Sequence, residues 1–299
     1  MRRLAIGIGL AWASAACSGD LPARLPETVA RPVLLAQASD AKSTKDHNAC
    51  ADGADSVYVF DDQGRIHLFE PDGPVERRFQ LVATPDCGDA SGPQSMSLDH
   101  EGVAWLLFTS GRLFKMKLPE GECEATPYQH AGSGGVMGMT FTAADSGSKK
   151  ERLYISDRMG LFEVRLPDLQ PVLLSATVPV GELAGGPDGL VFHIDLGTGM
   201  LSELDRKTLA LRSVHPFGAT GGAFTLLRHR RGFFYFSAEP GGASHIYRWS
   251  PRVAETIDLG MAPEGIRILG RAQSVCVEWS EGDGLAAEPF GAPKDAPRP

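Results

Sequence analysis

The sequence feature that most constrains the fold is a short apolar run that recurs six times. The runs lie 37 to 49 residues apart and begin at Val57, Ala104, Leu153, Leu190, Phe233 and Val275. Each of the first five is followed, after a short turn, by a second strand in which apolar and polar residues roughly alternate. Such alternation places one face of a strand in the core and the other in water. A period of this length with several short strands per unit is typical of β-propeller blades.

We therefore predict an all-β chain that folds as a β-propeller, with six blades of four antiparallel strands over residues 49–284. Only five second strands are visible, so the C-terminal blade lacks its outer half. We expect the apolar segment Arg31–Ala36 to complete this blade. Five blades with a spare C-terminal strand is the alternative. The tail 285–299, rich in Ala and Pro, is predicted to be disordered.

The starts of the blades carry recognisable motifs. Residues 93–114 resemble the P-x-S-M-x-x-D-x-x-G-x-x-W blades of bacterial six-bladed propellers, and residues 186–190 and 263–266 resemble the same blade starts. Over roughly residues 50 to 280 the chain is similar to the NHL and SMP-30 (gluconolactonase-like) propeller superfamily. It also resembles propeller-type lipoproteins of Gram-negative bacteria. These are blade motifs, so the resemblance implies a fold more strongly than an activity.

The N-terminus predicts export. A basic start at Arg2 and Arg3 precedes an apolar stretch over 4–12 and small residues that end at Cys17. The apolar stretch is far shorter than the roughly 20 residues that a bilayer requires, so residues 1–16 are interpreted as a signal peptide. Cys17 resembles the cysteine of a bacterial lipobox, although Ser14 stands where Leu is more usual.

We expect Cys17 to carry lipid such as palmitate and to anchor the protein to a membrane of a Gram-negative cell envelope, facing the periplasm or the cell surface. Ordinary signal cleavage near Cys17 is the alternative. Residues 17–48 have too little hydrophobic pattern to fold alone and are predicted to form a flexible tether.

The four other cysteines suggest two disulfides, because an even number of cysteines in an oxidising compartment commonly pairs. Spacing alone leaves three pairings open. Cys50 flanks the first blade and Cys276 lies in the last run, and a ring brings its two ends together. Cys87 lies in the loop entering the second blade, whose outer strand begins at Cys123. The preferred pairs are therefore Cys50 with Cys276 and Cys87 with Cys123. No CxxC pair is present, which argues against a zinc site.

The net charge of the chain bears on whether nucleic acid is a partner. The net charge of −8 argues against nonspecific binding of nucleic acid. One basic cluster, at residues 228–231, is interpreted as a solvated turn.

Signals for catalysis are few. The resemblance to SMP-30 lactonases implies Glu, Asn and Asp ligands that converge on the ring axis and bind calcium or a similar ion. Asp99, Asp188 and Glu264 are the carboxylates near blade starts, but the single Asn of the chain, Asn48, precedes the first blade. We therefore interpret Asp99 and Asp188 as residues that stabilise turns. No cofactor is expected, with calcium as the alternative. The histidines show no ligand spacing, there is no Gly-x-Ser-x-Gly motif, and the recurring aromatic residues are expected to pack between blades.

Two classes of function remain. The first is a noncatalytic propeller that is anchored to a membrane and binds a protein, peptide or glycan at the cell envelope. The second is a metal-dependent lactonase or hydrolase with a site on the ring axis. The lone Asn and the missing nucleophile motif favour the first class.

Overall fold

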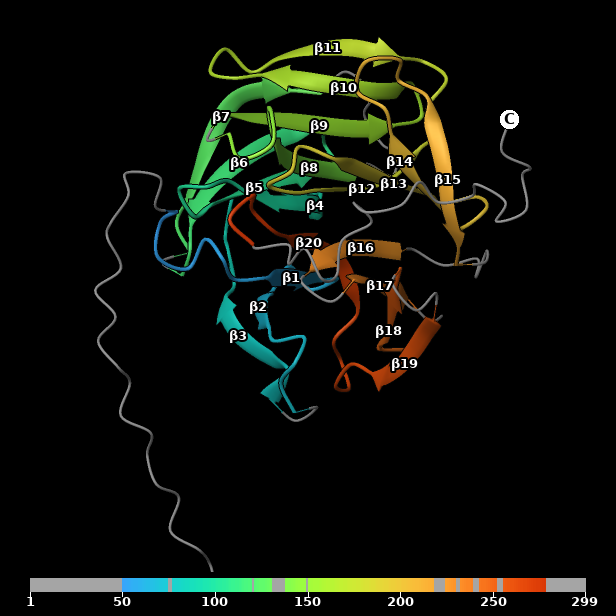
Figure 1. Ribbon diagram of the computed structural model, residues 1–299. Helices are drawn as coiled ribbons and strands as arrows, with labels where there is room; N and C mark the ends of the chain where they lie inside the picture. Colours follow the sequence, from blue (N-terminus) through green and yellow to red (C-terminus); the bar gives the residue numbers. More distant parts are fainter. Residues whose placement is uncertain are drawn as a thin grey trace, which may run out of the picture. The chain divides into compact units, whose positions relative to one another are not determined.

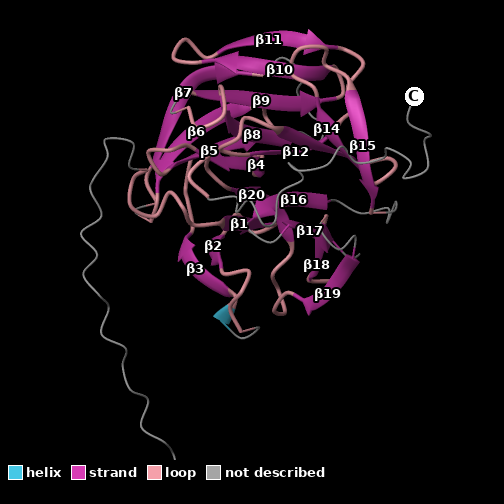
Figure 2. Cartoon of the chain, viewed as in Figure 1, coloured by secondary structure: helices cyan, strands magenta, loops and turns pink. Residues whose placement is uncertain are grey.

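The computed structural model describes residues 50–277 except 75–76, 120, 131–137, 149, 218–223, 230–231, 239–241 and 252–254. These residues belong to one compact unit, Lys45–Pro299. They form five four-stranded antiparallel sheets (Figures 1 and 2), so the all-β propeller fold is confirmed. The predicted signal peptide, Cys17, the tether with Asn48, and the tail 285–299 lie outside the described residues. Within the described part of the chain, no helix is long and apolar enough to span a membrane.

Each sheet is one blade. The blades are numbered in the order in which their three outer strands occur along the chain. Blade 1 consists of β20 (Ile268–Ala272), β1 (Tyr58–Asp61), β2 (Ile66–Phe69) and β3 (Phe79–Ala83). Blade 2 consists of β4 (Pro93–Leu98), β5 (Val103–Phe108), β6 (Arg112–Lys117) and β7 (Cys123–Gln129). Blade 3 consists of β8 (Gly138–Ala143), β9 (Glu151–Asp157), β10 (Gly160–Arg165) and β11 (Gln170–Ser175).

The last two blades follow the same order from the inner to the outer strand. Blade 4 consists of β12 (Gly181–Gly185), β13 (Val191–Asp195), β14 (Met200–Leu204) and β15 (Leu211–Pro216). Blade 5 consists of β16 (Phe224–His229), β17 (Gly232–Ala238), β18 (Ser244–Ser250) and β19 (Glu255–Met261).

The prediction of six blades is wrong, and the five-blade alternative is correct. The described part of the apolar run at Val275, residues 275–277, forms a turn and not a strand, although Val277 is buried in the same hydrophobic cluster as Val57 and Val59. This part of the run is therefore apolar because its valine side chains are buried, although it is not part of a strand. Instead, β20 pairs antiparallel with β1 and becomes the inner strand of blade 1. All five sheets have four strands without Arg31–Ala36, a segment that lies outside the described residues.

The core lies between neighbouring blades. Trp105 of blade 2 packs edge-to-face on Phe141 of blade 3, with ring centroids 5.4 Å apart. Phe192 of blade 4 and Phe233 of blade 5 pack in the same way at 4.8 Å. Further buried members of these layers include Phe60, Phe69, Phe114, Tyr154, Phe234 and Phe236. The predicted role of the recurring aromatic residues in packing is therefore confirmed for these residues, while Trp279 lies outside the described part of the chain.

The inner strands of the blades follow one another around a closed ring, in the order β4, β8, β12, β16 and β20. Side chains satisfy backbone N–H groups at the facing edges of these strands, where no ladder exists. Ser97 Oγ accepts a hydrogen bond from Phe141 N at 2.9 Å, and Thr140 Oγ1 accepts one from Gly185 N at 2.8 Å. Buried backbone donors rarely remain unpaired, so these hydroxyl groups allow the inner edges to be buried.

Both predicted disulfides are present. Cys50 and Cys276 are joined across 226 residues of sequence with their Cα atoms 5.9 Å apart. Cys87 and Cys123 are joined with their Cα atoms 5.0 Å apart. Next to the first bond, Ser274 Oγ donates to Ala54 O at 2.5 Å. The two ends of the described propeller are thus held together covalently and by hydrogen bonding.

Candidate functional site

The three carboxylates considered as metal ligands do not converge. Asp99 lies in the turn after β4, Asp188 in the turn before β13, and Glu264 in the loop between β19 and β20. Glu264 borders a cavity of about 610 Å³ together with Asp62 and Arg267. In the part of the chain that the structure describes, no group of three or more His, Cys, Asp or Glu side chains is placed to hold a metal ion.

Asp99 stabilises its turn, as predicted. Its Oδ1 accepts hydrogen bonds from Glu101 N at 3.0 Å and Val103 N at 2.9 Å. Its Oδ2 accepts a third from Trp105 Nε1 at 2.8 Å. This carboxylate therefore joins the turn to Trp105, a buried residue of β5.

Asp188 has a second role that the sequence did not predict. Its Oδ1 accepts from Leu190 N at 3.0 Å, as a turn residue would. The carboxylate also forms a bidentate pair with Arg228 of the neighbouring blade, including an Nη1–Oδ1 distance of 2.8 Å. Burial raises the pKa of Asp188, but the hydrogen bonds and charge of Arg228 outweigh this effect and hold the pKa below its ordinary value. Asp188 therefore bridges blades 4 and 5.

The interpretation of residues 228–231 as a solvated turn is wrong for its first two residues. Arg228 and His229 belong to β16 and are buried, and the Arg228 side chain is only 1% exposed. A buried charge needs a partner, which Asp188 supplies, and the guanidinium also lies 5.0 Å from the centre of the Phe192 ring. Residues 230–231 lie outside the described part of the chain.

Charged and polar side chains gather on the inner strands. Glu182 of β12 and Arg271 of β20 are 3% and 2% exposed, and Thr140 and Thr225 are fully buried on β8 and β16. Arg271 Nε donates to Leu226 O, and its Nη2 lies 3.5 Å from Thr140 Oγ1. The Arg271 side chain thereby links three inner strands.

Burial strongly shifts the pKa values of two members of this cluster, Glu182 and Arg271. Burial raises the pKa of Glu182 to about 8, and the charge of Arg271 offsets this only in part. Burial likewise lowers the pKa of Arg271 to about 10, partly offset by Glu182. Among the residues that the structure describes, Arg271 Nη1 and Thr225 Oγ1 have no hydrogen-bond partner. Chemically, Glu182 can hold a proton near neutral pH at a position that is only 3% exposed.

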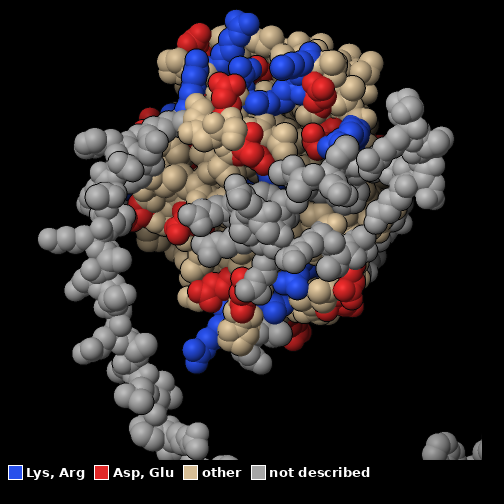
Figure 3. Space-filling model, in the orientation of Figure 1, with Lys and Arg blue, Asp and Glu red and all other residues tan. Residues whose placement is uncertain are grey.

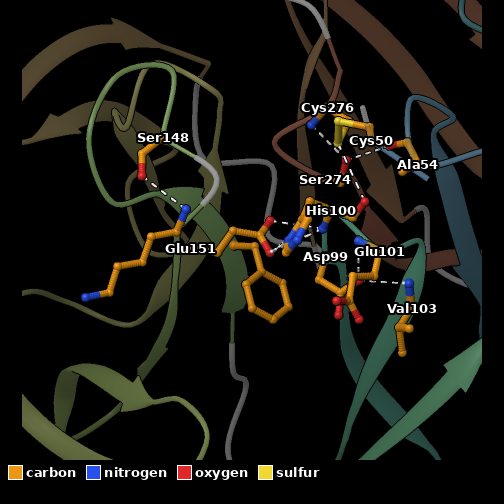
Figure 4. A network of polar contacts seen from close by, with 12 residues as sticks. Cys50, Ala54, Asp99, His100, Glu101, Val103, Ser148, Glu151, Ser274 and Cys276 are labelled. Atoms are coloured by element: carbon orange, nitrogen blue, oxygen red, sulfur yellow. Dashed lines mark hydrogen bonds and ion pairs between the residues drawn. A yellow bond between two sulfur atoms is a disulfide. The ribbon is translucent and has the colours of Figure 1, made fainter. Parts of the chain in front are cut away.

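A second polar cluster faces solvent, at the junction of blades 2 and 3. His100 follows β4, and its Nδ1 lies 2.6 Å from Oε2 of Glu151, the first residue of β9. The His100 backbone N also donates to Glu151 Oε1 at 3.1 Å. Figure 4 shows His100 between Glu151 and the Cys50–Cys276 disulfide. The contact joins two blades beside the seam of the ring, since Ala51 N donates to His100 O at 3.1 Å.

The pKa values of both His100 and Glu151 lie above their ordinary values, that of Glu151 chiefly because of burial. Burial lowers the pKa of His100, but the hydrogen bond that its ring donates to Glu151 and the negative charges of Glu151, Asp99 and Glu101 outweigh this effect, so the pKa lies above its ordinary value. The Glu151 side chain is 4% exposed and the His100 side chain 37%. A buried carboxylate thus orients a histidine that remains open to solvent.

A groove of about 560 Å³ begins at this pair. Besides His100 and Glu151, its lining includes Lys150, Arg152, Arg165, Leu166 and Asp168. Histidine, lysine and arginine donate hydrogen bonds to oxyanions, so this groove is the solvent-accessible candidate site that the described structure supports best.

Sequence reasoning missed the residues of both clusters. Glu182 lies in Gly181–Gly185, a strand made mostly of small residues and lacking the apolar alternation used to find strands. A lone glutamate within such a run is a signal that could have been noticed. The pairing of His100 with Glu151 spans 51 residues and depends on how two blades meet, and the sequence alone carries no signal for it.

Comparisons with known proteins support the fold and leave the family open. No family model matches this sequence, and no curated protein matches it significantly. The structure is similar to a chain in the crystal structure of a nidogen/laminin complex, with a TM-score of 0.52 and 9% identity over 73% of this chain and 97% of that chain. At such low identity, this similarity shows the fold alone.

Two similar structures come from Bacteroides thetaiotaomicron. One is a protein of unknown function, with a TM-score of 0.42 and 11% identity over 60% of this chain and 53% of that chain. The other is the extracellular domain of a candidate one-component system, with a TM-score of 0.38 and 11% identity over 71% of this chain and 30% of that chain.

Proposed function

We propose that this chain is an exported, noncatalytic β-propeller that is anchored to a membrane of the cell envelope through lipid on Cys17 and binds a protein, peptide or glycan. The observation that carries the proposal is the pair of disulfides, Cys50–Cys276 and Cys87–Cys123. Disulfides persist in oxidising compartments outside the cytosol, and the residues that precede the propeller have the pattern of a signal peptide ending in a lipobox-like cysteine.

The structural roles of two acidic residues favour binding over catalysis. Asp99 holds a turn and Asp188 neutralises a buried arginine, so both carboxylates are committed to the fold. The structurally similar chain from the nidogen/laminin complex comes from an assembly of proteins, which is consistent with a propeller that serves as a binding surface.

Cell fractionation tests the anchoring. The native protein should sediment with membranes, whereas Cys17→Ser should be released into the soluble fraction because the acceptor of the lipid is gone. Peptide mapping without reduction should find both disulfides in each form. A Cys17→Ser protein that still fractionates with membranes would contradict anchoring through this residue.

Metal analysis tests the noncatalytic role. The purified full chain should contain no stoichiometric calcium, and added Ca²⁺ should leave its thermal unfolding unchanged. Tightly held calcium, combined with hydrolysis of simple lactones, would replace the proposal with a metal-dependent lactonase.

A further inference from the structure

We propose that the groove between blades 2 and 3 binds an oxyanion, a carboxylate or phosphate group of the ligand, through His100, Lys150 and Arg165. The inference rests on the proposed binding function and names the chemistry that the ligand must present.

The first step concerns the orientation of His100. Because Nδ1 is held 2.6 Å from Glu151 Oε2, the opposite ring nitrogen, Nε2, is the one available to a ligand. A buried carboxylate that fixes one nitrogen of a histidine sets both the ring orientation and the tautomer. In the protonated ring, Nε2 is a charged hydrogen-bond donor.

The second step concerns the balance of charge in the groove. Two of its three carboxylates are already paired, Glu151 with His100 and Glu163 with Arg152, whose Nη1 lies 3.4 Å from Glu163 Oε2. Within the described residues, no ion pair is formed by the side chains of Lys150 or Arg165, both exposed. Two cations are therefore free to pair with a ligand.

The remaining carboxylate sharpens the prediction. Asp168 is exposed in the same lining and has no ion-pair partner among the described residues. It opposes an anion, so removing its charge should strengthen binding, whereas removing the charge of Lys150 or Arg165 should weaken it. Figure 3 shows Lys and Arg side chains over the blade formed by β8–β11, with Asp and Glu among them. The surface is thus mixed, and the prediction depends on which charges are paired.

The pH dependence follows from the groups that face His100. Glu151 contacts the ring directly, Asp99 and Glu101 flank it in its own turn, and Lys150 and Arg165 line the same groove. The carboxylates favour the imidazolium. An anion beside Nε2 adds a further negative charge, so binding should raise the pKa of His100 and should itself strengthen as the pH falls.

The test is a titration of the purified full chain with inorganic sulfate, with the NMR signals of the His100 imidazole as the readout. The His100→Gln variant identifies these signals by their absence. Sulfate keeps its charge over the range of about pH 5 to 8 in which histidine titrates. We expect a saturable shift of the His100 signals that strengthens toward low pH. Lys150→Gln and Arg165→Gln should each weaken the apparent affinity by about two- to fivefold, and Asp168→Asn should strengthen it by about twofold, as charges at an exposed site do.

Arg158→Gln is the matched control, because Arg158 is an exposed cation in the turn between β9 and β10 of the same blade and outside the groove lining. It should leave the affinity unchanged. Parallel titrations with phosphate and with acetate distinguish the source of the oxyanion: tighter phosphate binding identifies a phosphorylated ligand, and tighter acetate binding a carboxylate ligand.

The proposal is overturned if no anion gives a saturable shift of His100, or if Arg158→Gln weakens binding as much as the groove variants do. If anions do not bind but the native protein still fractionates with membranes, the groove proposal is wrong and the proposed membrane-anchored binding propeller still stands. Conversely, anion binding by a protein that does not fractionate with membranes would separate the groove from the anchoring.

Discussion

At the scale of single residues, the propeller carries charge in two contrasting ways. Arg228 is buried and forms a hydrogen-bonded pair with the partly exposed carboxylate of Asp188, so each neutralises the other. Glu182 and Arg271 are both buried, but no ion pair or hydrogen bond joins them among the contacts that the described residues make. Burying a charge without a direct partner is costly, and the protonated form of Glu182 avoids part of this cost.

Stability should therefore depend on pH through Glu182. Its folded pKa of about 8 lies above the ordinary 4.5, so the neutral form stabilises the fold below pH 4.5 and this stabilisation is lost as the pH rises through 8. The loss is about 5 kcal/mol at most. Glu182→Gln should remove this dependence. Urea unfolding at pH 5 and pH 9 measures it, with Glu124→Gln, an exposed residue of β7, as the control. If the unfolding free energy changes equally between pH 5 and pH 9 in Glu182→Gln and in the native protein, Glu182 is not the source of the pH dependence.

At the scale of elements, neighbouring blades are joined by close backbone approach and by buried polar contacts. A Cβ on Gly185 of β12 would collide with the carbonyl oxygen of Phe141 on β8. Tyr128 at the end of β7 places its hydroxyl 2.7 Å from His130 Nδ1, and His130 Nε2 lies 2.7 Å from Asp157 Oδ2 of blade 3. The blades therefore have little freedom to shift against one another.

Gly185→Ala should be strongly destabilising. The added methyl group must displace a backbone segment of the next blade, and such overpacking typically costs about 1–3 kcal/mol. Gly197→Ala, in the β13–β14 turn where the nearest atom to an added Cβ is an Asp195 side-chain oxygen, should cost about 0.5 kcal/mol or less. The melting temperatures of the two variants compare them directly. Similar losses in both would argue against a special closeness of β8 and β12.

Tyr128→Phe tests the polar contact between blades 2 and 3. Removing the hydroxyl leaves the buried Nδ1 of His130 without its partner, which should cost about 1–2 kcal/mol of unfolding free energy. Tyr58→Phe, at a half-buried tyrosine of β1, provides the comparison. If chemical denaturation gives the same small effect for both, the Tyr128–His130 contact contributes little to stability.

Much of each blade could be predicted from sequence, because β5, β9, β13 and β17 are buried on both faces and read as apolar runs. The cysteine pairs were also predictable once a ring was assumed. The number of blades was not, because the run at Val275 is buried in a turn and has the composition of a strand. The buried Glu182 and the His100–Glu151 groove could not be predicted from sequence either, since both depend on which residues the packing of neighbouring blades brings together.

At the scale of the whole molecule, the two disulfides close loops of different length. Cys50–Cys276 spans 226 residues and Cys87–Cys123 spans 36. Chain-entropy models then give stabilisations of about 5 and about 4 kcal/mol, respectively, before any strain. The double variant Cys50→Ser/Cys276→Ser should therefore lose more unfolding free energy in urea than Cys87→Ser/Cys123→Ser. The reverse order would show that the longer closure stabilises less than its loop length implies.

The pairing of β20 with β1 sets the order in which the molecule can be completed. Strand β20 begins 207 residues after β1 ends, so blade 1 remains a three-stranded sheet with an open edge until nearly all of the propeller has been synthesised. An open edge is a site where unfinished chains can join one another. A chain interrupted before Ile268 would keep that edge permanently, so nascent or truncated forms should be the species that need chaperones, while the finished ring does not.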